Sequence, residues 1–217
     1  MKYMAEFIEH FNKRNYFSIR DARIFLKQKK ISTGYLKLLI HTLLKKNKLK
    51  RLAKGIYTFK DELMVAGFAF SPFYYGLQEA LSIHRLWGQA TNPVIITTKK
   101  VRAGTRTVMN SNITIKRISP KMFFGYKIIE HYGLQIPVSD LEKTLIDFAY
   151  FRQKIPEEAL KTLLASIQKK RLGEYLRKSP KQTRKAITKL LEKPKKRKQE
   201  KSRKLRARWA CLKAKQN

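Results

Sequence analysis

Cysteine, acidic residues and long apolar runs are all scarce in this chain of 217 residues. The one cysteine, Cys211, has no second thiol with which to form an internal disulfide, so we expect a reducing, cytoplasmic setting. No run of about 18 apolar residues occurs, so no transmembrane helix is expected. The N-terminal residues also lack the apolar core of a signal peptide. Disulfide-stabilised secreted scaffolds and membrane-spanning proteins are therefore not expected.

The shortage of acidic residues leaves a large excess of positive charge. There are 50 Lys and Arg residues against 15 Asp and Glu, which gives a formal net charge of +35. The excess is +13 in residues 1–60, +6 in residues 61–176 and +16 in residues 177–217. With 43% hydrophobic residues, the chain is too apolar to be disordered throughout. This balance excludes an acidic mimic and favours a polyanionic partner, either nucleic acid or an anionic membrane surface.

The first sixty residues change from helical to strand-like patterns. Apolar spacing over residues 4–11 predicts a first helix, and Ser18 followed by Asp21 predicts the capped start of a second. Ser32 or Thr33 can cap a third helix. Two short strand-like runs with a glycine turn between them then predict a hairpin. This is the order of a winged helix-turn-helix, in which the third helix enters the DNA major groove and the hairpin lies beside the backbone.

The third helix and the hairpin carry residue types that contact DNA. Basic side chains neutralise phosphates and release counterions, and hydroxyls at a helix N-terminus contact phosphates or base edges. Leu38 is apolar on a polar face, where it could touch a thymine methyl group or a partner chain. The alternative is a small helical domain with a solvated basic face. The candidate DNA-binding residues are Ser32, Thr33, Tyr35, Lys37, Leu38, His41, Lys45, Lys48, Lys50, Arg51 and Lys54.

Residues 66–176 predict a second domain of different character. Ser71-Pro72 is typical of a helix start, and several short β-rich runs follow between residues 93 and 138. Ser139 with Glu142 three residues later predicts a capped helix after these strands, and a further helix is expected from about residue 156. Strands with helices before and after them define an α+β fold class, with a small mixed sheet behind an N-terminal winged helix-turn-helix at residues 1–60.

We expect neither an enzyme nor a metal or cofactor site. The histidines are scattered without zinc-ligand spacing, and there is no glycine-rich phosphate loop or nucleophile elbow. A nuclease could use Asp140 and Asp147 with Glu142, but capping explains Glu142 and a helix surface explains the two aspartates. A metal-dependent nuclease also needs several carboxylates at one site. We expect His84 to be a hydrogen-bonded core histidine rather than a catalyst, and Glu79 to be a surface residue or a member of a buried pair rather than an acid–base group.

Several short motifs occur in a familiar order along the chain. They are Tyr16 to Ala22, Gly55-Ile56-Tyr57, Gly76 to Gly88, Val94 to Thr98 and Val138 to Asp147. Over about residues 5–175 the chain resembles the AbiEi-type antitoxins, which are transcriptional regulators of bipartite toxin–antitoxin systems. The resemblance implies a winged-helix domain that binds double-stranded operator DNA and represses its own operon. It also implies a C-terminal domain that counters a nucleotidyltransferase-like toxin without stable complex formation.

A stand-alone basic DNA- or RNA-binding protein with no toxin partner is the alternative. The tail at residues 177–217 departs from the pattern of the family. Residues 181–191 can form a helix that ends before Pro194, a basic run follows, and Leu205, Trp209 and Leu212 have the spacing of a last amphipathic helix. Three roles compete for this tail: non-specific phosphate contact, a partner or membrane surface, or none.

Overall fold

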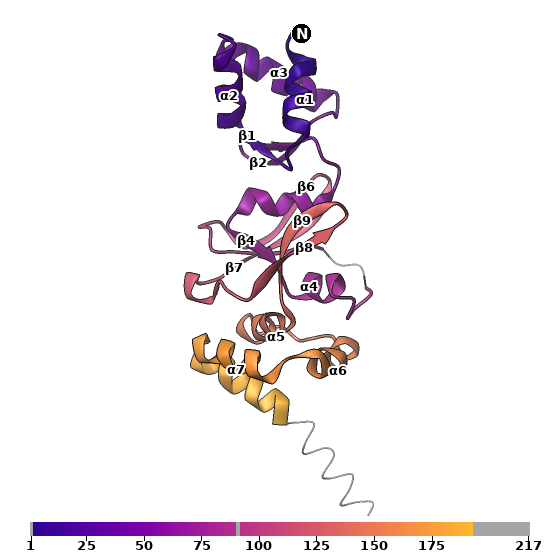
Figure 1. Ribbon diagram of the computed structural model, residues 1–217, viewed down its shortest axis with the longest axis vertical. Coiled ribbons are helices and arrows are strands. Elements are labelled where there is room, and N and C mark those ends of the chain that lie inside the picture. The colour runs from indigo at the N-terminus through magenta and orange to yellow at the C-terminus, as the bar shows by residue number, and fades with distance from the viewer. Residues whose placement is uncertain (1, 90–91, 193–217) are drawn as a thin grey trace, which may run out of the picture.

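The computed structural model describes residues 2–89 and 92–192. Three regions follow one another along the long axis (Figure 1). N-terminal helices lie at one end with a small sheet beneath them, a larger mixed sheet forms the middle, and C-terminal helices lie at the other end. The expected α+β class is confirmed. No helix in the described part of the chain has both the length and the apolar composition needed to cross a membrane.

The N-terminal region consists of three helices and a three-stranded antiparallel sheet in the order β1-β3-β2. The predicted caps of the second and third helices, Ser18 and Ser32, are both present. The Ser18 hydroxyl accepts a hydrogen bond from the Asp21 N–H at 3.2 Å, and the Asp21 carboxylate accepts one from the Ser18 N–H at 2.8 Å. The elements are α1 (Met4–Asn12), β1 (Phe17–Ser18), α2 (Ile19–Gln28), α3 (Thr33–Lys45), β2 (Lys50–Ala53) and β3 (Ile56–Thr58).

The hairpin formed by β2 and β3 lies between the three helices and the middle region (Figure 1). Tyr57 faces the core of the helices, whereas Leu52 is buried in the core of the middle region, with Ile56 packed against that core. Tyr16 stacks on Phe68 with a ring-centroid distance of 5.4 Å. The two faces of this small sheet are therefore covered from opposite sides.

The middle region is a six-stranded sheet in the order β6-β7-β5-β4-β9-β8. The β4–β9 and β5–β7 pairs are parallel, and the other pairs are antiparallel. Its elements are η1 (Leu63–Phe70, a 3-10 helix), β4 (Phe73–Tyr75), α4 (Gln78–Ile83), β5 (Val94–Thr97), β6 (Gly104–Val108), β7 (Ser111–Arg117), η2 (Pro120–Met122), β8 (Tyr126–His131) and β9 (Leu134–Ser139).

Neighbouring residues of the central strands alternate between two cores. Tyr75 and Ile95 face η1 and the hairpin, whereas Tyr74 and Ile96 face the C-terminal helices. These helices are α5 (Leu141–Tyr150), α6 (Glu157–Ser166) and α7 (Lys169–Lys178), and residues 181–192 are also helical. The sheet is thus covered on one side by η1 and the hairpin and on the other by helices.

Two local predictions in this region were wrong. Ser71-Pro72 does not start a helix but precedes the buried strand β4, whose three residues are all apolar and face both cores. The cap of α5 is Asp140, one residue later than predicted, because Ser139 ends β9 and pairs with Tyr126 of β8. The Asp140 carboxylate accepts the Lys143 N–H at 2.8 Å.

The core continues beyond the predicted tail boundary at residue 177. The helical residues 181–192 place Ile187, 1% exposed, against the C-terminal helices, with Leu190 and Leu191 beside it. Residues 177–192 are therefore part of the folded region rather than a separate tail. The predicted basic run, the predicted last helix with Leu205, Trp209 and Leu212, and Cys211 lie outside the described residues.

Candidate nucleic-acid interface

Helix α3 has one buried and one exposed face. Leu36, Leu39 and Leu43 lie in the N-terminal core. On the opposite face, Thr33, Lys37, Leu38, His41 and Lys45 are all exposed, and the Leu38 side chain is 58% exposed. The helical period of 3.6 residues brings these five side chains onto one stripe. The stripe combines a hydroxyl, two ammonium groups, an imidazole and an aliphatic side chain.

Two of the predicted contact residues are used in forming the start of α3. The Ser32 hydroxyl accepts a hydrogen bond from the Tyr35 N–H at 3.3 Å. The Tyr35 hydroxyl in turn accepts one from the Tyr3 N–H at 3.1 Å, and the two tyrosine rings meet edge to face. These contacts attach α3 to the start of the chain. Of the hydroxyl groups predicted to contact DNA, that of Thr33 is the exposed one without such a structural bond among the described residues.

The basic residues after α3 differ in their availability. Lys48, Arg51 and Lys54 are exposed. Lys50 is half-buried and forms an ion pair with Asp61. Because Leu52 is buried against the middle region, the hairpin presents its edge and turn to solvent rather than a strand face. The exposed part of the predicted wing is therefore confined to Arg51 and Lys54.

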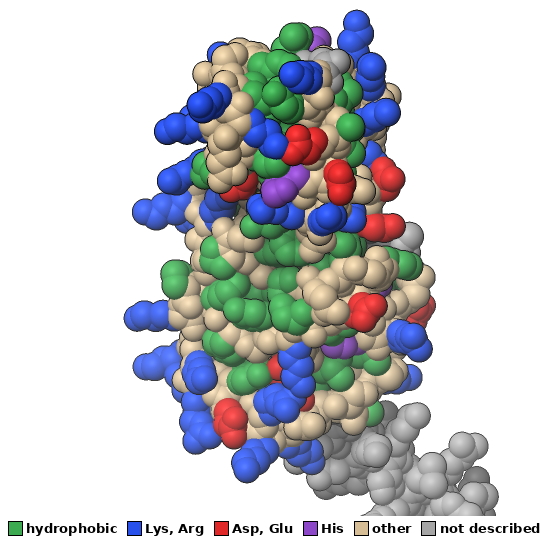
Figure 2. Space-filling model, turned by 45° about the horizontal axis from the view of Figure 1, so that its top comes forward, with side chains coloured by type: hydrophobic (Ala, Val, Ile, Leu, Met, Phe, Trp, Pro, Cys, Tyr) green, Lys and Arg blue, Asp and Glu red, His purple; other side chains and the backbone are tan. Residues whose placement is uncertain are grey.

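Acidic side chains in the N-terminal region are few, and each has a partner. Within the first sixty residues, Glu9 pairs with Lys13 and Glu6 with Lys29. Hydrogen bonds from the Ser18 backbone and hydroxyl lower the pKa of Asp21. In the described part of the chain, no salt bridge neutralises Lys37 or Lys45 of α3. Figure 2 shows Lys and Arg side chains projecting around this end of the molecule and along one of its edges.

The acidic residues that a nuclease could use point into the protein. The prediction that Asp140 and Asp147 lie on a helix surface was wrong, because both are buried. Asp140 accepts a hydrogen bond from the Tyr175 hydroxyl at 2.7 Å, and Asp147 pairs with Lys143. Burial raises the pKa of both aspartates. Glu142 does not complete a capping box but accepts the Gln168 N–H at 2.6 Å. These carboxylates tie α5 to its neighbours.

The predictions for His84 and Glu79 had different outcomes. The predicted hydrogen bond of His84 is present, since its Nε2 lies 2.8 Å from the Ser139 carbonyl oxygen, but the residue is half-buried rather than part of a core. The interpretation of Glu79 as a surface residue or a member of a buried pair was wrong. Its side chain is buried, and no donor or cation among the described residues contacts its carboxylate. The sequence could not reveal the state of Glu79, because a sequence shows neither the burial of a side chain nor the absence of its partners.

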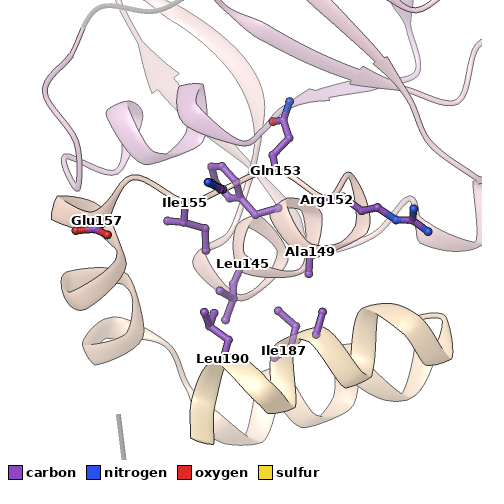
Figure 3. A pocket seen from close by; sticks show the side chains of 11 residues that line it. Leu145, Ala149, Arg152, Gln153, Ile155, Glu157, Ile187 and Leu190 are labelled. Atoms are coloured by element: carbon purple, nitrogen blue, oxygen red, sulfur yellow. The ribbon is translucent and has the colours of Figure 1, made fainter. Parts of the chain in front are cut away.

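An apolar cavity of about 450 Å³ lies between α5 and the helical residues 181–192. In Figure 3, Leu145, Ile187 and Leu190 lie around this cavity, whereas Arg152 extends away from it. The buried Gln153 Oε1 has no hydrogen-bond partner in the described part of the chain. The cavity thus offers apolar volume but no converging charged groups, and it is a weaker functional candidate than the exposed face of α3.

No protein-family model matches this chain, and no curated protein does. Among solved structures, the crystal structure of the Rv2827c protein from Mycobacterium tuberculosis is similar in fold. The TM-score is 0.57, and the match covers 84% of this chain and 74% of that chain at 12% sequence identity. At this identity, the likeness shows a shared α+β fold alone.

Proposed function

We propose that this chain is a DNA-binding transcriptional regulator whose N-terminal region acts as a winged helix-turn-helix. The order α1, β1, α2, α3, β2, β3 supports this proposal, because it is the order in which winged-helix domains place a recognition helix before the wing. In this proposal α3 enters the major groove of the operator. Arg51 and Lys54 act as the wing and contact the adjacent backbone.

The observation that carries the proposal is the exposed stripe on α3. Lys37 and Lys45 are exposed and carry no salt bridge within the described residues, so their charge is available to phosphates. Thr33 at the N-terminus of the helix can donate to a phosphate or a base edge. Leu38 has the apolar side chain that suits contact with a thymine methyl group.

A binding titration tests this interface. The probe is a fluorescent duplex from the region upstream of the chain's own coding sequence, measured by anisotropy at several salt concentrations. Each phosphate contact adds about 0.9 to the slope of log affinity against log salt. Lys37→Gln with Lys45→Gln should weaken binding and reduce the slope by about 2. Lys154→Gln with Lys161→Gln, two exposed positions near α6 and on it, is the matched control. Equal slopes for both double variants would refute the interface.

We further propose that the regulator is the autorepressing antitoxin of a toxin–antitoxin pair. The motif resemblance supports this role, and the low charge of the middle region suits a protein partner. The test is co-expression with the product of the adjacent gene. The full chain carrying Lys37→Gln and Lys45→Gln should still restore growth, because toxin neutralisation is assigned to the middle region. Failure of the unaltered chain to restore growth would reject the antitoxin role and leave DNA binding intact.

The second candidate is a stand-alone basic protein that binds DNA or RNA without a toxin partner. The net charge of +35 favours it, because much of that charge lies outside the first sixty residues. Competition in the same titration distinguishes the two. A regulator should prefer its upstream duplex over a structured RNA of equal length, whereas a general basic protein should bind both alike.

A further inference from the structure

A second cavity, independent of the proposed DNA interface, is bordered by η1, α4, residues 87–89, Pro93 and the turn that joins β8 to β9. Its volume is about 470 Å³, which is in the range of small-molecule sites. Two carboxylates, an indole, an imidazole and a phenol line this cavity, among aliphatic side chains. These groups belong to Glu62, Glu79, Trp87, His131 and Tyr132. A site of this composition is unexpected in a chain with so few acidic residues.

Glu79 is the decisive side chain in this cavity. It is 9% exposed, and burial alone raises its pKa to about 7. Buried charges in proteins are nearly always paired, because removing a carboxylate from water is costly. Among the described residues, however, no donor or cation contacts the Glu79 carboxylate. A cation arriving through the cavity would supply the missing partner.

Glu79 is one of the residues that line the cavity. No hydrogen bond or salt bridge engages the Glu79 carboxylate among the described residues, and the residue borders the same space as Trp87 and Tyr132. Glu79 belongs to the first turn of α4, which forms one wall of the cavity.

The remaining lining groups define the kind of cation. Trp87 and Tyr132 contribute aromatic rings to the lining, and aromatic rings attract organic cations. Met64 and Ile83 offer aliphatic surface that suits a hydrocarbon chain. A metal ion needs several converging ligands, and no group of three or more His, Cys, Asp or Glu side chains suited to a metal occurs in the described part of the chain. The lining therefore suits an amphipathic organic cation.

We propose that this cavity binds a primary ammonium group carried on an aliphatic chain, with the ammonium on Glu79 and the chain against Ile83 and Trp87. Glu62 at the cavity edge adds a second, more exposed negative charge. The proposal does not depend on DNA binding, because none of these residues lies on α3 or the hairpin.

Calorimetric titration of the full chain with n-hexylamine tests the proposal. Hexan-1-ol, which has the same chain without the charge, is the matched ligand. We expect saturable binding of hexylamine and at least tenfold weaker binding of hexanol. Glu79→Gln should weaken hexylamine binding at least tenfold, whereas Glu174→Gln, at an exposed acid of α7, should leave it unchanged. Equal binding of amine and alcohol by the unaltered chain would overturn the proposal without any substitution.

Two further arms refine the result. The titratable groups that face the site are Glu62, Glu79, His131 and Tyr132. Affinity for hexylamine should rise at least fivefold from pH 6 to pH 8 as Glu79 ionises, and it should still rise in His131→Gln. If the affinity of His131→Gln did not change between pH 6 and pH 8, the pH effect would belong to His131, and the role of Glu79 would be contradicted. Nα-acetyl-lysine N-methylamide compares the two sources of an alkylammonium: tighter binding than hexylamine indicates a protein lysine, and weaker binding indicates a free amine.

Discussion

The Lys143 ammonium and the Asp147 carboxylate form an ion pair one turn apart on α5, and neither side chain is exposed. The Tyr74 hydroxyl of β4 donates to the other Asp147 oxygen at 2.9 Å. The ammonium lies 5.0 Å from the ring centre of Phe124 and 5.5 Å from that of Tyr74. Burial raises the pKa of Asp147 and lowers that of Lys143, and the opposite charge of each opposes the shift of the other. This pair joins the central sheet to α5.

Removing one member of this pair should be more harmful than replacing both. Asp147→Asn leaves the buried Lys143 ammonium without its counter-charge, and we expect the free energy of unfolding to fall by about 3–5 kcal/mol. Lys143→Met with Asp147→Leu removes both charges and should cost less than the single change. Denaturant unfolding of the three proteins makes the comparison. A loss below about 1 kcal/mol for Asp147→Asn would indicate that the pair is open to water.

Gly125 and Gly133 differ in what surrounds them although both have a positive φ, of 71° and 69°. A Cβ at Gly125 would lie 2.8 Å from the Tyr175 ring and 2.9 Å from the Lys143 Cβ, whereas one at Gly133 would meet nothing within 4 Å. We expect both alanine variants to lose stability through backbone strain. The loss at Gly125 should be larger by about 1–3 kcal/mol, the usual cost of overpacking. Thermal unfolding of both proteins measures the difference, and equal losses would show that Tyr175 and Lys143 move aside freely.

Glu79 should make stability depend on pH. Burial raises its pKa in the folded state to about 7, above the ordinary value of 4.5, so the folded state retains the proton that the unfolded state loses. The favourable contribution of the protonated form is complete below about pH 4.5 and is lost as pH rises through 7. Glu79→Gln cannot ionise and so does not lose stability in this way. The difference in free energy of unfolding, variant minus unaltered chain, should therefore increase by up to about 3 kcal/mol between pH 5 and pH 8. A difference independent of pH would mean that the Glu79 carboxylate is well solvated.

The helices and the hairpin of the first sixty residues were predictable because their signals are local. The Ser18–Asp21 capping pair and the apolar stripe of α3 each lie within a few residues, and the structure has both where they were expected. Strand β1 was missed because two residues carry no period, and it forms only by pairing with β3. Strand β6 was missed because four of its five residues are exposed at a sheet edge.

The parts that could not be predicted depend on contacts between distant residues. Leu52 was predicted to belong to a hairpin beside DNA, but it is buried against a core formed mainly by residues 64 onward. Asp147 looked like a surface residue until Tyr74, 73 positions away, was placed beside it. For the candidate site, the sequence identified the exposed residues of α3 but could not show that Tyr35 and Lys50 have structural partners.

Site-specific cross-linking tests most directly the central claim that the exposed face of α3 meets DNA. Leu38 and Ile128 are matched positions, being 58% and 60% exposed on α3 and β8. Each is changed to cysteine in a Cys211→Ser background, labelled with benzophenone maleimide and irradiated with the upstream duplex at saturating protein. We predict that Leu38→Cys cross-links to the duplex and that Ile128→Cys does so at background level. Cross-linking from position 128 that equals or exceeds that from position 38 would contradict the account.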